Sequence, residues 1–150
     1  MFAPRAVTLM AICLIVFALD ARAGELVNKD GADLAIKGYD PVAYFTEGRP
    51  IAGVPEFEQT WHDAVWRFSS AEHLRLFARD PERYAPRYGG FCAGAMANGW
   101  KVTVDPEAWT IIDGKLYLSF RKDLIKRFAQ DPVENVAKAD ANWQRIGHSE

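Results

Sequence analysis

Three side chains between residues 73 and 96 are of types that bind soft metal ions: His73, Cys92 and Met96. If residues 91–98 form a helix, Cys92 and Met96 are four residues apart and share one face. A thiolate with a thioether suits Cu(I), and the imidazole of His73 would complete a three-coordinate site. The residue types and spacing therefore predict a copper site made by these three side chains.

Each of these side chains also has a purely structural interpretation. Met96 is of a type that fills irregular gaps in a core. His73 lies beside the apolar stripe of its predicted helix, where a buried and hydrogen-bonded histidine is common. We expect His62 to be exposed in a hairpin turn. His148, close to the C-terminus, carries no functional information.

Cys92 follows a glycine pair, Gly89-Gly90, that allows a sharp turn and a close backbone approach. We expect it in the first turn of a short helix, where free amides and the helix dipole lower the pKa of a thiol. Such a thiol is suited to metal binding or redox chemistry. The alternative is that Cys92 packs in the core as a small apolar residue.

The N-terminal residues 1–23 have the pattern of a cleaved secretory signal peptide. One positive charge (Arg5) precedes an apolar run that is too short to span a bilayer, and Ala21-Arg22-Ala23 is a cleavage signal. Cleavage after Ala23 removes Cys13, so no intramolecular disulfide can form. We expect a periplasmic or secreted protein without stable membrane insertion.

The remaining residues, 24–150, are the length of one ordinary domain. Without the signal peptide the net charge changes from −2 to about −3, and no basic stripe remains. This argues against nucleic acid and anionic lipid as partners. We expect a metal ion, or a protein of the cell envelope, as the partner instead.

The pattern of apolar residues and turn signals predicts two β-hairpins and several short helices. The hairpins span 57–68 and 109–120, and the second has an Asp-Gly turn. One helix is predicted to begin near Ser70, after a capping box made by Ser69 and Glu72, and another after Asp131-Pro132. Two more helices are predicted to span residues 91–98 and 121–128. Hairpins and helices in this order predict an α+β fold without internal repeats.

Two further predictions concern local structure. Asp105-Pro106-Glu107 is typical of the start of a helix. In the last helix, Val133, Val136 and Trp143 are expected to point inward.

Four stretches of the sequence resemble the YHS-domain family of bacterial exported proteins. They are GYDPVAYF (38–45), the stretch 66–93, DPEAWTIIDGKLYLSF (105–120) and KADANW (138–143). The resemblance covers nearly all of residues 24–150. It implies a small α+β domain, related to TRASH-like heavy-metal-associated modules, with a role in metal handling.

The sequence departs from the cysteine pattern of the metal-binding relatives. Ala43, Ser69 and His73 occupy the three positions at which those relatives carry ligand cysteines. A structural zinc site needs four thiolate or imidazole ligands, and at most one of these three is kept. A structural zinc site is therefore not expected.

Three functions remain open from the sequence. The first is soft-metal binding centred on Cys92, with copper as the metal. The second is thiol redox chemistry, in which Cys92 passes through a sulfenic acid or a mixed disulfide. The third is a non-catalytic binding module with an aromatic surface that includes Trp100 and Trp109. Nothing supplies an oxyanion hole or a substrate groove, so the sequence favours a non-enzymatic role.

Overall fold

A computed structural model describes residues 25–146 of the chain. The predicted signal peptide and His148 lie outside these residues. The fold is mixed α+β, with two separate antiparallel hairpins and short helices, which confirms the predicted class. Within residues 25–146, no helix is long and apolar enough to cross a membrane.

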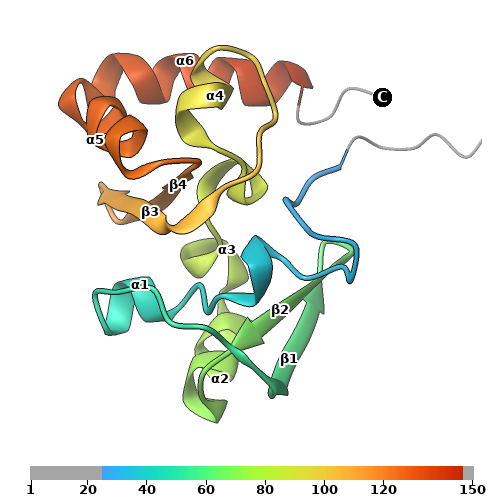
Figure 1. Cartoon of the computed structure of the whole chain (residues 1–150). Helices are drawn as coiled ribbons and strands as arrows, with labels where there is room; N and C mark the ends of the chain where they lie inside the picture. Colours follow the sequence, from blue (N-terminus) through green and yellow to red (C-terminus); the bar gives the residue numbers. More distant parts are fainter. Residues whose placement is uncertain (1–24, 147–150) are drawn as a thin grey trace, which may run out of the picture.

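The elements fall into two consecutive series of six. The first series, which we call the first unit, consists of η1 (Ile36–Gly38), α1 (Ala43–Thr46), β1 (Val54–Trp61), β2 (Ala64–Phe68), α2 (Ala71–Arg79) and α3 (Pro81–Tyr84). The second unit consists of η2 (Arg87–Gly90), α4 (Ala93–Ala97), β3 (Asp105–Ile112), β4 (Lys115–Ser119), α5 (Lys122–Gln130) and α6 (Pro132–Ile146). In Figure 1 the first unit lies below the second.

The two units repeat one structure with a shift of 51 residues. When 51 is added to the residue numbers of β1, β2 and α2, the result is the bounds of β3, β4 and α5. The same addition takes the first residue of α3 to the first residue of α6. It also relates backbone positions with positive φ, among them Lys37 with Tyr88 and Gly48 with Gly99. The prediction that the chain has no repeats is therefore wrong. Most equivalent residues differ, but Phe-Ala-x-Asp-Pro occurs at both 77–81 and 128–132. The repeat is therefore clearer in backbone conformation than in sequence.

The two hairpins are built in the same way. In the first hairpin, Trp61 pairs with Ala64, and the turn residues His62 and Asp63 both have positive φ. The turn residues of the second hairpin, Asp113 and Gly114, also have positive φ. Each hairpin has a register shift at the start of its first strand. Both predicted hairpins are confirmed.

The N-terminus of α2 differs in detail from the predicted capping box. The side chain of Ser70, rather than that of Ser69, accepts the hydrogen bond from the backbone N–H of His73. Ser69 bonds to a carboxyl group of another loop. The helix therefore starts where predicted, with its neighbouring serine as the cap.

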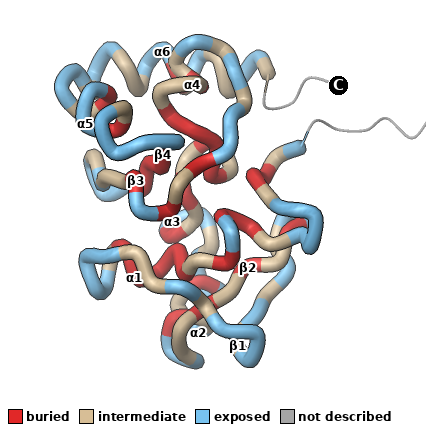
Figure 2. Tube along the Cα trace, viewed as in Figure 1, coloured by how far each residue is buried: buried red, intermediate tan, exposed pale blue. Residues whose placement is uncertain are grey.

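Strand β4 connects the two parts of the core. Leu116 and Leu118 pack in a cluster with Trp66 and Phe77 of the first unit, whereas Tyr117 packs with Phe128 of the second. Successive strand residues point to opposite faces, so this hairpin forms a wall between two apolar clusters. Figure 2 shows the buried stretches on the inner sides of the hairpins and helices.

Two local predictions are wrong. Asp105-Pro106-Glu107 begins strand β3 rather than a helix, and the Asp105 side chain accepts the backbone N–H of Glu107. Val133 is 83% exposed, because α6 turns this position to solvent, while Val136 and Trp143 pack against the core.

Candidate functional site

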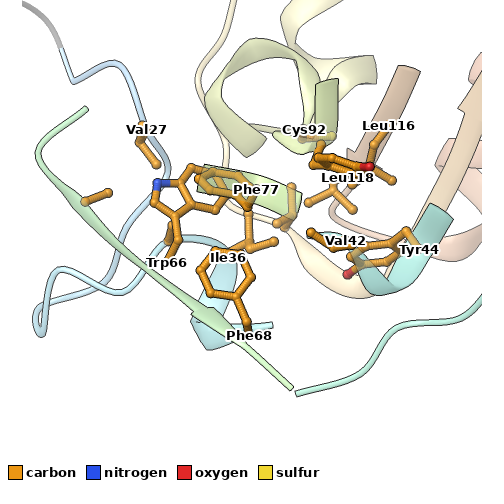
Figure 3. Close-up of a cluster of buried hydrophobic side chains, with 14 residues drawn as sticks. Val27, Ile36, Val42, Tyr44, Trp66, Phe68, Phe77, Cys92, Leu116 and Leu118 are labelled. Carbon is orange, nitrogen blue, oxygen red and sulfur yellow. The ribbon is translucent and has the colours of Figure 1, made fainter. Parts of the chain in front are cut away.

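Cys92 lies in the core at the junction of the two units. Its exposure is 2%, and Figure 3 shows its side chain beside Leu116 and Leu118. The sulfur is 3.4 Å from Ser119 Oγ, and the backbone N–H donates to Val102 O at 2.9 Å. Cys92 is the N-cap residue of α4, one position before the first turn in which it was predicted, and its side chain makes no capping bond.

Met96 is fully buried in the apolar cluster of the second unit, together with Tyr117 and Phe128. Its backbone N–H donates to the carbonyl of Cys92, so the two residues are one helical turn apart as expected. This environment matches the alternative interpretation of Met96 as core filling.

His73 belongs to a buried polar network in the first unit. Its Nδ1 is 2.6 Å from Asp40 Oδ2, and its Nε2 is 3.0 Å from the hydroxyl of Thr46. Since a carboxylate oxygen only accepts, Nδ1 is the donor in the contact with Asp40. The Thr46 hydroxyl also donates to the carbonyl of Val42 at 3.3 Å. Glu47 lies 3.8 Å from the same Nε2.

Asp40 is the centre of this network and is fully buried. One carboxyl oxygen accepts the backbone N–H groups of Val42 and Ala43. The other accepts the backbone N–H and the hydroxyl of Ser69, in addition to His73. A buried carboxyl group with five donors joins the loop before α1 to the start of α2.

The structure brings Cys92 and Met96 into one turn, whereas His73 makes its polar contacts with Asp40, Ser69 and Thr46. Among residues 25–146, no group of three or more His, Cys, Asp and Glu side chains is arranged to hold a metal ion. The copper site of His73, Cys92 and Met96 stays a prediction.

A groove lies over Cys92, between α4, α5 and the start of α6, with a volume of about 490 Å³. We call it the cysteine groove. Its lining is mainly apolar and includes Phe120, which is 47% exposed. The lining residues are Cys92, Gly94, Ala95, Ala97, Asn98, Val102, Phe120, Leu124, Arg127, Phe128 and Asn135.

Comparison of the two units gives a physical reason for the groove. The shift of 51 residues makes Ala95 equivalent to Tyr44, and Asn135 equivalent to Tyr84. Both tyrosines are buried in the first unit, where Tyr44 also donates to the carbonyl of Pro106 at 2.8 Å. The second unit thus has two aromatic rings fewer at the equivalent positions, which leaves space between its helices.

The rim of the cysteine groove carries an exposed cation, Arg127. Among residues 25–146 it makes no ion pair within 4 Å, although Arg121 and, to a smaller extent, Arg127 lower the pKa of Asp123 on the same helix. The side-chain amides of Asn98 and Asn135 donate to the backbone carbonyls of Gly94 and Phe128. Arg127 is therefore the exposed cation of the lining, and it shares its electrostatic interaction with Asp123.

Sequence reasoning missed this groove because no motif of reactive residues marks it. The available signal is the run of small residues at Gly94, Ala95 and Ala97, where the equivalent stretch of the first unit has larger side chains. This signal has meaning only once the repeat is recognised. No family model, no curated protein and no solved structure matches the chain.

Proposed function

We propose that this protein is an exported, non-catalytic binding protein whose ligand is a small amphipathic anion held in the cysteine groove. The observation that supports the proposal is an apolar groove with the exposed cation Arg127 at its rim, which makes no ion pair within 4 Å among residues 25–146. The volume of about 490 Å³ is in the range of small-molecule sites. An alkyl carboxylate has the matching chemistry, since its chain contacts Phe120 and Leu124 while its head group faces Arg127.

The apolar contacts set the affinity of such a ligand. Each methylene that leaves water contributes about 0.8 kcal/mol, or about a fourfold gain in affinity. Within the series hexanoate, octanoate and decanoate, affinity is therefore expected to rise by about tenfold or more per two carbons until the groove is filled. A head group near an exposed arginine adds less, about 0.2 to 1 kcal/mol.

The test is isothermal titration calorimetry of the alkyl carboxylates with residues 24–150. Arg127→Gln is expected to weaken decanoate about threefold, and Phe120→Ser is expected to weaken it further. The control is Arg79→Gln, since Arg79 is exposed in the last turn of α2 as Arg127 is in the last turn of α5. Affinity that does not depend on chain length, or an equal effect of the two arginine substitutions, would refute the proposal.

A Cys92→Ser variant separates this proposal from the copper and redox hypotheses. Both hypotheses need the sulfur of Cys92, whereas the amphipathic anion needs only the shape and polarity of the groove. Decanoate binding is therefore expected to persist in Cys92→Ser. A parent protein that binds Cu(I) but no alkyl carboxylate, and loses Cu(I) on this substitution, would favour the metal site.

A further inference from the structure

A second groove lies where the loop after α1, strand β3 and the first turns of α5 meet, on the left side of Figure 1. Its volume is about 370 Å³, which is in the range of small-molecule sites. The charged and aromatic side chains of its lining are Arg49, Glu107, Trp109, Lys122 and Lys126. We call this site the basic groove. It shares no lining residue with the cysteine groove.

Three of these side chains are cations, and two of the three have no partner. The exposed side chains of Arg49 and Lys126 make no ion pair within 4 Å and no hydrogen bond among residues 25–146. The third cation is Lys122, whose Nζ lies 3.3 Å from a carboxyl oxygen of Glu107. Three cations and one carboxylate give the lining a net charge of +2. This charge is complementary to a dianion.

The nearest carboxylate on α5 explains why Lys126 is unpaired. Asp123 lies one helical turn before Lys126, but its two oxygens accept from Arg121 at 2.9 and 2.7 Å. At the equivalent positions of the first unit, Glu72 pairs with Arg75 instead. The unpaired cation is therefore a consequence of the arginine that precedes α5.

The first unit has no equivalent of the basic groove's chemistry. The shift of 51 residues places Ala71 at the position of Lys122, and Glu58 at the position of Trp109. Glu58 forms an ion pair with Arg67 at 2.7 Å. The cations and the indole are therefore specific to the basic groove and do not follow from the repeated backbone.

Trp109 gives the basic groove an aromatic wall that is fixed and still accessible. Its side chain is partly exposed, and its ring lies 5.3 Å from that of Tyr44 in an edge-to-face arrangement. Tyr44 is in turn held by its hydrogen bond to the carbonyl of Pro106. A ring held in this way offers contact area to a ligand at low entropic cost.

We propose that the basic groove binds a small aryl phosphate, that is, a phosphate monoester with an aromatic ester group. The phosphate dianion pairs with Arg49 and Lys126, and the aromatic ring contacts Trp109. Arginine and lysine are the side chains that pair with phosphate oxygens in proteins. A singly charged anion matches the two unpaired cations less well than a dianion does.

The experiment is a titration of residues 24–150 with phenyl phosphate, followed by the NMR signal of the Trp109 indole N–H. At about pH 7.5 the phosphate monoester is a dianion, since its second pKa is about 6. We expect a saturable shift of the Trp109 signal. Phenyl sulfate keeps the ring with one charge and is expected to bind about threefold more weakly. Inorganic phosphate lacks the ring and is expected to bind about tenfold more weakly.

Substitutions place the ligand among the cations. Arg49→Gln and Lys126→Gln are each expected to weaken phenyl phosphate about threefold, and the double variant about tenfold. Both side chains are exposed and unpaired, so these changes break no contact of the fold. Arg75→Gln removes the equivalent cation of α2, and Arg127→Gln changes the cysteine groove. At about 0.15 M salt, each of these two controls is expected to change the affinity less than about 1.5-fold.

The proposal is overturned by any of four results. They are a Trp109 signal that does not shift to saturation, a matched ligand that binds as tightly as phenyl phosphate, a double variant that keeps the affinity of the parent, and a control that weakens binding as much as the single substitutions in the basic groove.

Discussion

Among substitutions of a single polar residue, we expect Asp40→Asn to cause the largest loss of stability. Asp40 is fully buried, and its two carboxyl oxygens accept from five donors. An asparagine keeps one acceptor oxygen and replaces the other with an NH₂ group. If the NH₂ group takes the place of Oδ2, it faces the donors of Ser69 and His73.

The size of the effect follows from these contacts. Removing one partner of a buried and hydrogen-bonded charged group costs about 3 to 5 kcal/mol. For a domain of this length, 1 kcal/mol corresponds to about 4 °C in the thermal midpoint. Asp40→Asn is therefore expected to lower the midpoint by about 10 to 20 °C.

Thermal unfolding followed by near-UV circular dichroism measures this loss, and Asp140→Asn is the matched control. Asp140 also accepts from a tyrosine and an arginine, but 44% of its side chain is exposed. Its loss is expected to cost about 1 kcal/mol. Equal midpoints for the two variants would show that the Asp40 network contributes no more than a surface bond, and the reasoning would be wrong.

Two further predictions concern buried titratable side chains and the thiol. Burial raises the pKa of Tyr44 and Tyr88 well above that of a free tyrosine, so these side chains ionise first in the unfolded chain, and stability is expected to fall as pH rises above about 10. Absorbance at 295 nm should show no titration of these two side chains before the protein unfolds. Titration of all tyrosines in the native state would contradict this prediction. Because Cys92 is only 2% exposed, we expect it to react with a thiol reagent far more slowly in the native than in the unfolded protein. Equally fast labelling in both states would show that Cys92 is a reactive thiol. A chelator is expected to leave the thermal midpoint of the protein unchanged.

Local sequence signals were sufficient for most of the secondary structure. The Asp113-Gly114 turn, the serines before α2 and the proline at the start of α6 each act within a few residues, and each element formed where these signals placed it. The prediction for Asp105-Pro106 failed because pairing with β4 outweighs the preference of this pair for a helix start.

The sequence did not reveal the contacts of the candidate site, because these join residues far apart in the chain. The hydrogen bond between Asp40 and His73 spans 33 positions, and no spacing rule connects a turn aspartate with a helix histidine. The cysteine groove depends on what is missing at Ala95 and Asn135. An absent side chain becomes informative only by comparison with Tyr44 and Tyr84 in the first unit.

The repeat also explains why the polar network and the groove do not occur in the same unit. At the positions equivalent to Asp40, Ser69 and His73, the second unit has apolar residues, in the order Phe91, Phe120 and Leu124. The three must change together, since a buried carboxylate without its donors would be strongly unfavourable.

The same exchange affects the surface. In the first unit, the bond from Ser69 to Asp40 holds the strand end against the loop before α1. Phe120, at the equivalent position, has no such bond and is 47% exposed at the groove. The residue at the position equivalent to Ser69 thus supplies the apolar wall that the proposed ligand contacts. At these equivalent positions the first unit therefore has a buried polar network, and the second unit has the lining of the cysteine groove.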